Sequence, residues 1–263
     1  MNVLAVAVAG RGLVGPHEPV FAADDEALLR GRAVFETARV YDGRAFLLDA
    51  HVDRLARSAA QVRLPAPDAA ECARLAALVV DAAGARDLSL RFYWTGTTLA
   101  ATAAAIDPEL EDRRARGLTL ASVRWSTGAL AAAKSTSYAE NMAAQDTAAE
   151  RGADDALLVA HDGTVLEAPT ANVWWREGDR LLTPSLELPI LAGVTRAVIL
   201  ELAPDAGYAV WEGVFPLDRL LVAEEVFLTS SIREVMPAAA VDDRRFELGP
   251  AARSLQAALR SRT

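Results

Sequence analysis

The stretch Asp155–Pro184, DALLVAHDGTVLEAPTANVWWREGDRLLTP, holds two hairpin signals in close succession. Asp162-Gly163 and Gly178-Asp179 each lie between runs rich in apolar and β-branched residues, a pattern typical of tight turns between antiparallel strands. The four expected strands cover residues 156–161, 164–167, 172–176 and 180–183. The stretch therefore predicts a meander of antiparallel strands.

Outside this meander, strands and helices mix without regular alternation. Further strands are expected at 3–9, 33–41, 44–48, 88–95, 99–106, 118–124, 225–228 and 235–241. Helices are expected after a cap at Asp49, over 69–83, from Thr136 or Ser137 to about 152, from Gly193 to about 206 and over 250–260. This pattern favours an α+β fold with largely antiparallel sheets over a doubly wound fold. The charged stretch 107–117 predicts the boundary between a small domain, 1–117, and a larger one, 118–263.

Composition excludes several classes of protein. The chain has 263 residues, of which 52% are hydrophobic, which is enough to form the core of a globular protein. A net charge of -9 argues against a nucleic-acid binder, which is normally basic. Cys72 is the sole cysteine and the three histidines are scattered, so we expect neither a disulfide framework nor a metal site. We expect no signal peptide and no membrane span, and hence a cytoplasmic enzyme or binding protein.

Lysine usage singles out one residue. Of the 27 basic residues, 26 are arginine, and Lys134 is the only lysine. The two residue types differ most where an amine must lose its proton and act as a nucleophile, because guanidinium stays protonated in proteins. Apolar neighbours without an adjacent carboxylate favour the neutral amine. Such an amine forms a Schiff base with a carbonyl, as pyridoxal phosphate enzymes require, although chance survival of one lysine is the alternative.

A pyridoxal phosphate site also needs an acid for the pyridine nitrogen, a phosphate cup and a partner for the ring hydroxyl. Glu167, at the end of an expected strand, suits the first role. Gly193-Val194-Thr195 before a helix, Thr229-Ser230-Ser231 after a strand, and Arg54 suit the second. Tyr138 suits the third. The last four have plainer interpretations. These are helix capping for Gly193-Val194-Thr195, an ordinary turn for Thr229-Ser230-Ser231, a solvated helix face for Arg54 and a packed helix tyrosine for Tyr138.

These residues stand within a longer series of motifs. The motifs are Phe35-Glu-Thr-Ala-Arg-Val-Tyr-Asp-Gly43, Leu48-Asp-Ala-His51-Val-Asp-Arg54-Leu55, Lys134-Ser-Thr-Ser-Tyr138, Glu167-Ala-Pro-Thr-Ala-Asn172, Ile190-Leu-Ala-Gly193-Val-Thr-Arg196 and Thr229-Ser-Ser-Ile-Arg-Glu-Val-Met-Pro237. In this order and spacing the sequence resembles the class IV aminotransferase family, the fold type IV pyridoxal phosphate enzymes, over nearly its whole length. The family includes branched-chain and D-amino acid aminotransferases and aminodeoxychorismate lyases.

The resemblance implies a two-domain fold type IV structure and a role for each candidate. Lys134 matches the lysine that binds the cofactor and then moves the proton. Glu167 matches the carboxylate facing the pyridine nitrogen. The matches to the phosphate ligands are Arg54, Val194, Thr195, Ser230 and Ser231. Tyr138 matches a tyrosine that contacts the ring hydroxyl in part of the family.

Three departures from the family pattern concern the pocket. Gly31-Arg-Ala33 stands where the family often has Gly-Asp-Gly, and Ser137 replaces the asparagine of Lys-x-x-Asn. Thr95-Gly96 stands where some members carry an arginine for the substrate carboxylate. Arg91 is a substitute candidate, or else a solvent-facing strand residue. Phe35, Arg91 and Thr95 are thus the expected substrate contacts.

The resemblance leaves the reaction open. Every version begins with exchange of the substrate amine at Lys134, followed by proton abstraction from the α-carbon by the released amine. The short chain, Thr37 and Glu-Val-Met-Pro are similar to 4-amino-4-deoxychorismate lyases, which form 4-aminobenzoate and pyruvate. In those lyases a threonine at the Thr37 position steers elimination. The alternative is an aminotransferase acting on branched-chain amino acids, D-amino acids or (R)-amines, with a 2-keto acid as acceptor.

A non-enzymatic binding module on the same fold is a third possibility, against which the presence of Lys134 and Glu167 argues. The resemblance also implies a homodimer that acts on a small amino-acid-like substrate.

Overall fold

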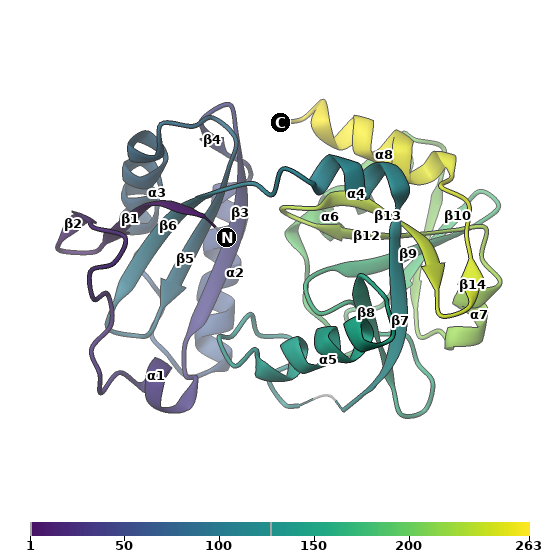
Figure 1. Cartoon of the computed structure of the whole chain (residues 1–263), viewed down its shortest axis with the longest axis horizontal. Helices are drawn as coiled ribbons and strands as arrows, with labels where there is room; N and C mark the ends of the chain where they lie inside the picture. The colour runs from purple at the N-terminus through teal and green to yellow at the C-terminus, as the bar shows by residue number, and fades with distance from the viewer. Residues whose placement is uncertain (1, 127) are drawn as a thin grey trace. The chain divides into compact units, whose positions relative to one another are not determined.

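The computed structural model describes residues 2–126 and 128–263, and the chain divides into two compact units (Figure 1). Unit 1 comprises Met1–Pro108 with Ala132–Tyr138, and unit 2 comprises Glu109–Ala131 with Ala139–Thr263. Each unit combines a β-sheet with helices, which agrees with the predicted α+β class. In the described part of the chain, no α-helix has the length and apolar character needed to cross a bilayer.

The sheet of unit 1 is antiparallel, and within the described residues its strand order is β2-β1-β6-β5-β3-β4. Its strands are β1 (Val3–Val8), β2 (Gly12–Val14), β3 (Val34–Tyr41), β4 (Arg44–Ala45), β5 (Leu88–Trp94) and β6 (Leu99–Ala105). The strands predicted at 33–41 and 44–48 pair across a two-residue turn at Asp42-Gly43, although the second strand ends at Ala45. Both turn residues have positive φ, 50° and 80°, as a tight hairpin of this kind requires.

Helices cover one face of this sheet (Figure 1). Unit 1 contains α1 (Glu26–Arg30), α2 (Leu48–Gln61) and α3 (Ala69–Ala83). The side chain of Asp68 caps α3 and Gly84 ends it with φ 64°, so both predicted ends are confirmed. The predicted cap at Asp49 is wrong. Leu47 takes a left-handed conformation, φ 51°, and turns the chain into α2 early, so that Asp49 lies in the first turn, where its charge faces the helix dipole.

Unit 2 is built on a mixed sheet in the order β11-β10-β9-β12-β13-β7-β8, with β14 paired to β13. Its strands are β7 (Leu118–Trp125), β8 (Asp155–Ala160), β9 (Asn172–Glu177), β10 (Arg180–Pro184), β11 (Ala209–Gly213), β12 (Glu225–Ser230), β13 (Glu234–Val241) and β14 (Arg244–Arg245). The central pairs from β10 to β13 are antiparallel, and the hairpin of β9 and β10 is confirmed. The pairs β10–β11, β13–β7 and β7–β8 are parallel.

The other predicted hairpin arm, residues 164–167, does not form a strand. The turn itself exists, because Asp162 accepts the N–H of Thr164 at 2.9 Å. Beyond the turn the chain makes only isolated bridges, Val159 with Val165 and Thr164 with Pro216. The N–H of Val165 donates to Phe215 at 2.9 Å, so the segment is shared between β8 and a distant loop. No local pattern encodes that competition.

The stretch 107–117, for which the sequence predicts only a charged boundary between domains, contains a helix. Unit 2 includes α4 (Leu110–Arg116), α5 (Ala139–Glu150), α6 (Val194–Leu202), α7 (Leu217–Leu221) and α8 (Pro250–Arg260). The first turn of α4 holds Glu111 and Asp112 and its last turn holds arginines, which complements the helix dipole. The prediction missed α4 because its charges read as a solvated linker, whereas Arg114 in fact pairs with buried Glu234.

Glu225 serves as a remote cap for α8. Its carboxylate, fully buried at the start of β12, accepts the N–H groups of Ala251 and Ala252 at 3.1 and 2.7 Å. It also accepts a hydrogen bond from Arg176 at 3.2 Å. A Cβ at Gly249 would lie 2.2 Å from the Glu225 carboxylate, so glycine is required where the chain enters the helix. These bonds tie α8 to the sheet.

We predict that Glu225→Gln lowers the free energy of unfolding by about 1–3 kcal/mol, because a buried charge-assisted cap is lost. Urea denaturation of the variant and of the wild-type protein measures this loss of unfolding free energy. The matched control is Glu224→Gln at the neighbouring exposed carboxylate, which should cost less than about 1 kcal/mol. Equal losses in the two variants would contradict the assignment.

Candidate active site

Lys134 is held by its backbone between a strand and a helix of unit 1. Its carbonyl accepts the N–H of Phe35 at the start of β3, at 2.9 Å. Its own N–H donates to the hydroxyl of Ser58 on α2, at 3.1 Å. The next residue, Ser135, forms a bridge with Val34. Both backbone groups of Lys134 are therefore satisfied, which fixes the point from which the side chain extends.

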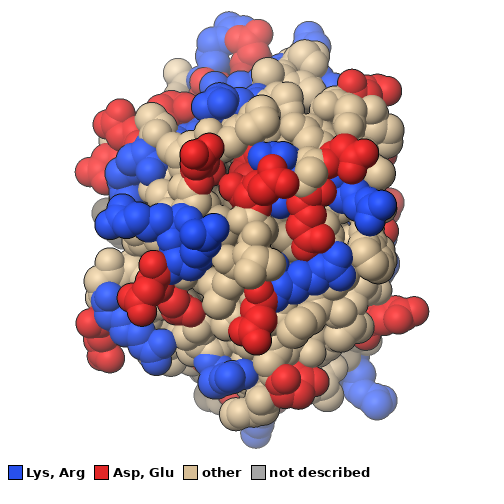
Figure 2. All heavy atoms as spheres, turned by 90° about the vertical axis from the view of Figure 1, so that its right-hand side faces the viewer, with Lys and Arg blue, Asp and Glu red and all other residues tan. Residues whose placement is uncertain are grey.

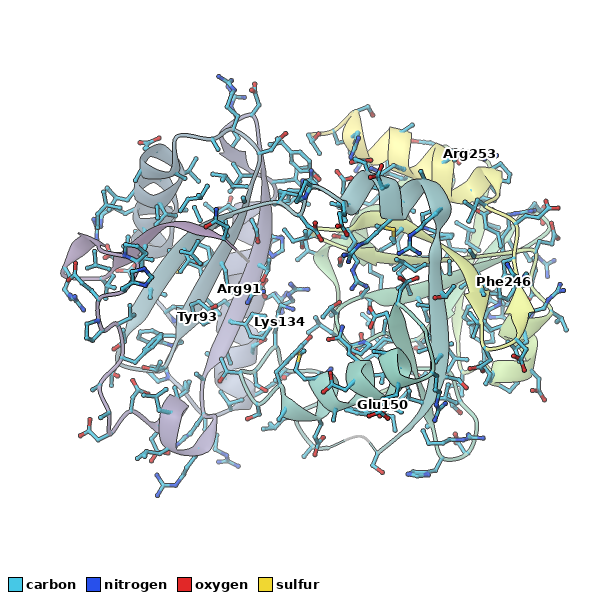
Figure 3. All side chains as sticks on the ribbon, in the orientation of Figure 1. Arg91, Tyr93, Lys134, Glu150, Phe246 and Arg253 are labelled. Carbon is cyan, nitrogen blue, oxygen red and sulfur yellow. The ribbon has the colours of Figure 1, made fainter. Side chains whose placement is uncertain are left out.

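The side chain of Lys134 lies over the ring of Phe35, with Nζ 4.6 Å from the ring centroid. The guanidinium of Arg91, on β5, lies over the same ring at 5.3 Å. Figure 3 labels both residues and shows their side chains close together. Arg91 also donates from Nε to the hydroxyl of Thr37, at 3.1 Å. Unit 1 thus gathers an amine, a guanidinium and a hydroxyl around one aromatic ring.

Strand register explains this gathering. Phe35 pairs with Tyr93 and Thr37 pairs with Arg91, so the four side chains project from the same face of the sheet. Tyr138 joins them, since its ring meets that of Phe35 edge-on with centroids 5.5 Å apart.

Thr95 directly follows β5, at the start of the loop after that strand. Its hydroxyl accepts the N–H of Thr98 at 3.1 Å and bonds the hydroxyl of Thr97 at 3.2 Å. Its polar group is therefore engaged within its own loop.

A buried charged cluster occupies the opposite face of β3. Glu36, fully buried, accepts two hydrogen bonds from Arg54 on α2, from Nε at 2.7 Å and from Nη2 at 2.8 Å. His51 contributes a third bond, from Nδ1 at 2.8 Å. Arg54 is only 5% exposed. The plainer interpretation of Arg54, as part of a solvated helix face, is therefore wrong.

The electrostatics of this cluster are governed by burial and by pairing. Burial alone would raise the pKa of Glu36, but hydrogen bonds and attraction from Arg54, and then from His51, outweigh it and lower that pKa to about 2. Burial lowers the pKa of His51 below its ordinary value, against the opposing effect of Glu36. Glu36 is accordingly a carboxylate and His51 a neutral donor at neutral pH.

Two members of this cluster were missed from the sequence, although signals existed. Glu36 alternates with Val34, Ala38 and Val40, so strand periodicity places a carboxylate on the core side. His51 lies three residues before Arg54, on the same side of a helix. A carboxylate at a core position needs a buried cationic partner, and the next helix supplies one.

In unit 2, Glu167 is held in a fixed orientation. Its carboxylate accepts the amide N–H of Asn172 at 3.0 Å and the backbone N–H of Leu191 at 3.1 and 3.2 Å. Asn172 also donates to the carbonyl of Leu191 at 2.9 Å. These bonds tie the loop after Glu167 to the segment that leads into α6.

That segment requires glycine at its end. A Cβ at Gly193 would lie 2.0 Å from the side-chain oxygen of Asn172. Gly193 precedes α6, and among the described residues no side chain caps the first turn of that helix. Val194 and Thr195 begin it, with Thr195 largely buried. An uncapped helix start presents backbone N–H groups and a partial positive charge, which suit a phosphate.

Ser230 and Ser231 lie where β12 ends and turns toward β13. The hydroxyl of Ser230 accepts the N–H of Arg233 at 3.3 Å. Glu234, buried and at φ 55°, closes the turn and is bonded by Arg114 at 2.9 Å and by Gln256 at 2.6 Å. The side chain of Arg233 pairs with buried Asp155. The turn is therefore fixed by ion pairs on neighbouring elements.

The candidate residues fall into two sets. Unit 1 brings together Lys134, Phe35, Thr37, Arg91 and Tyr138, with Arg54 on the other face of β3. Unit 2 carries Glu167, Val194, Thr195, Ser230 and Ser231. Figure 2, which faces unit 2, shows basic and acidic side chains interspersed rather than gathered by sign.

Comparisons with known proteins agree with this chemistry. The family described as amino-transferase class IV matches residues 33–241. The bifunctional aminodeoxychorismate lyase / D-amino acid transaminase of Mycobacterium tuberculosis is 31% identical, covering 91% of this chain and 92% of that protein. The aminodeoxychorismate lyase of Bacillus subtilis is 28% identical, covering 91% and 88%. A hypothetical aminotransferase from Mycobacterium tuberculosis, solved in PLP-bound form, has a TM-score of 0.91 and 29% identity, covering 98% of this chain and all of that one.

We predict a specific acid dependence of stability from Glu36. Its pKa falls from 4.5 to about 2 on folding, so its contribution is complete above pH 4.5 and is lost as the pH falls through about 2. That difference corresponds to about 3 kcal/mol. The stability gap between the wild-type protein and Glu36→Gln, measured by urea unfolding, should therefore narrow by about this amount from pH 5 to pH 2. A gap that does not change with pH would contradict the pairing.

Proposed function

The chain belongs to the class IV aminotransferase family, and from that premise we propose that it is a 4-amino-4-deoxychorismate lyase, which forms 4-aminobenzoate and pyruvate. It is a pyridoxal phosphate-dependent enzyme of that family. The observation that carries the proposal is the gathering of Lys134, Thr37 and Arg91 around Phe35. Pyridoxal phosphate, when bound, supplies an electron sink for the charge that forms at the substrate α-carbon.

The residues present fit this cofactor chemically. Lys134 is the chain's only side-chain amine, and its backbone is fixed on both sides. The orientation of the Glu167 carboxylate, set by Asn172 and Leu191, suits a partner for a protonated pyridine nitrogen. We assign the phosphate to Arg54, to the start of α6 at Val194 and Thr195, and to Ser230 and Ser231. Tyr138 is assigned to the ring hydroxyl.

In the proposed reaction Lys134 removes the proton from the substrate α-carbon and then transfers it to a different atom of the reacting molecule. Arg91 binds a substrate carboxylate, as its guanidinium geometry suits, and Phe35 and Thr95 line the substrate side. Thr37 supports the lyase assignment. Because its oxygen accepts the Nε–H of Arg91, its own hydrogen is directed elsewhere and is suited to donate to a substrate oxygen during elimination.

The second candidate function is an amino-acid aminotransferase with a 2-keto acid acceptor. It is supported by the same amine and guanidinium, which suit a branched-chain or D-amino acid, or an (R)-amine, and by a relative whose name joins both activities. We further propose that the protein is a cytoplasmic homodimer, on family resemblance.

We predict that the purified protein with pyridoxal phosphate is yellow and that borohydride reduction makes the cofactor attachment permanent. Lys134→Ala should lose the colour and the reducible attachment, because no other side-chain amine exists. Absorbance spectra and intact mass measure both. Tyr138→Phe is the control and should keep the attachment. Full reducible attachment in Lys134→Ala would overturn the assignment.

A separate assay decides between the two reactions. Aminodeoxychorismate is supplied to the purified enzyme without any 2-keto acid. We predict pyruvate and 4-aminobenzoate in equal amounts over many turnovers, because elimination needs no amino acceptor. Product that forms only when a keto acid is added would refute the lyase assignment and support the aminotransferase. A panel of amino donors run in parallel identifies that substrate.

A further inference from the structure

The sequence motif that includes Phe35 also contains Glu36, which has no role in the proposed reaction. Strand alternation directs Phe35 toward Lys134 and Arg91, and directs Glu36 to the opposite side, against α2. There its carboxylate contacts Arg54 and His51. The question is what a fully buried carboxylate does at that position.

The bonding pattern fixes the orientation of Arg54. Its Nε and Nη2 atoms bond separate oxygens of Glu36, at 2.7 and 2.8 Å, so one edge of the planar guanidinium is chelated. Two bonds in one plane leave the group little freedom to rotate, and Nη1 is directed to the opposite edge. His51 bonds the same carboxylate from the side, at 2.8 Å, and so holds the chelating group itself.

Packing alone does not explain the cluster, because burying its charged groups costs desolvation free energy. Two ions are withdrawn from water among Val34, Ala38 and Leu55, where apolar side chains of similar volume would fill the space at no desolvation cost. The pair also cancels the charge of Arg54. A phosphate that meets Arg54 therefore meets an oriented donor edge rather than an unbalanced positive charge.

We propose that Glu36, held by His51, is a positioning residue that presents Arg54 to the cofactor phosphate. This inference rests on the proposed phosphate role of Arg54. The hydroxyl of Ser58, one turn beyond Arg54 on α2, bonds the backbone of Lys134, so the same helix fixes both the phosphate arginine and the lysine. Preorganisation of this kind adds affinity because the protein group is ordered before the ligand arrives.

The test compares two ligands that differ only in the phosphate, pyridoxal phosphate and pyridoxal. Each is titrated into cofactor-free protein and followed by absorbance. Glu36→Gln should weaken binding of pyridoxal phosphate about tenfold or more, and binding of pyridoxal by less than about threefold. A purely structural role would weaken both alike, and that outcome would overturn the proposal.

Further variants separate the possible failures. Glu71→Gln is the matched control, because Glu71 chelates Arg74 with the same geometry on the exposed side of α3. It should leave both affinities unchanged. Arg54→Gln should remove the preference for the phosphorylated ligand, and a preserved preference would refute the phosphate role of Arg54 itself. If Arg54→Gln lost the preference for pyridoxal phosphate over pyridoxal and Glu36→Gln kept it, only the positioning role of Glu36 would be refuted.

Glu36→Asp covers the case in which Glu36→Gln does not fold. It keeps the charge but withdraws the carboxylate by one methylene group, so Arg54 is neutralised without being correctly oriented. The preference for pyridoxal phosphate over pyridoxal should again fall several-fold. An unchanged preference in this variant would overturn the proposal.

Discussion

The buried ion pair between Glu36 and Arg54 is the constraint on which the geometry of unit 1 depends. It joins β3 to α2 in the interior of the unit. Because side chains alternate along a strand, the position of Glu36 on one face sets that of Phe35 and Thr37 on the other. The same helix bonds the backbone of Lys134 through Ser58. The helix that pairs with this carboxylate therefore also fixes the backbone of Lys134.

The elements that could be predicted from sequence are those encoded by local signals. Helix α3 has a capping Asp68 and a terminal Gly84, and α8 begins at Pro250. The elements that could not be predicted are decided by distant contacts. Arg114 of α4 pairs with Glu234, which is distant in sequence, and residues 164–167 bond both to β8 and to Phe215. Strand β11 carries no pattern of its own and is held by parallel pairing with β10.

The candidate site residues were likewise only partly predictable from the sequence. Lys134, Glu167 and Arg54 could be nominated because chemistry restricts their residue types. Glu36 and His51 could not be nominated by type, since their roles exist only once β3 packs on α2. Their signal was an acidic residue in an apolar stripe, which becomes informative only when the burial of its partner Arg54 is also inferred.

The arginine-rich composition now has a structural meaning. The buried carboxylates Glu36, Glu225 and Glu234 are each bonded by arginine, whose planar fork matches a carboxylate and stays charged when buried. The only lysine, Lys134, stands at the position that we propose for an amine that changes its protonation state. The most direct measurement is therefore peptide mapping by mass spectrometry after borohydride reduction of the wild-type protein with pyridoxal phosphate. We predict the cofactor mass on the peptide containing Lys134, and modification of the N-terminal amine alone would contradict the assignment of Lys134.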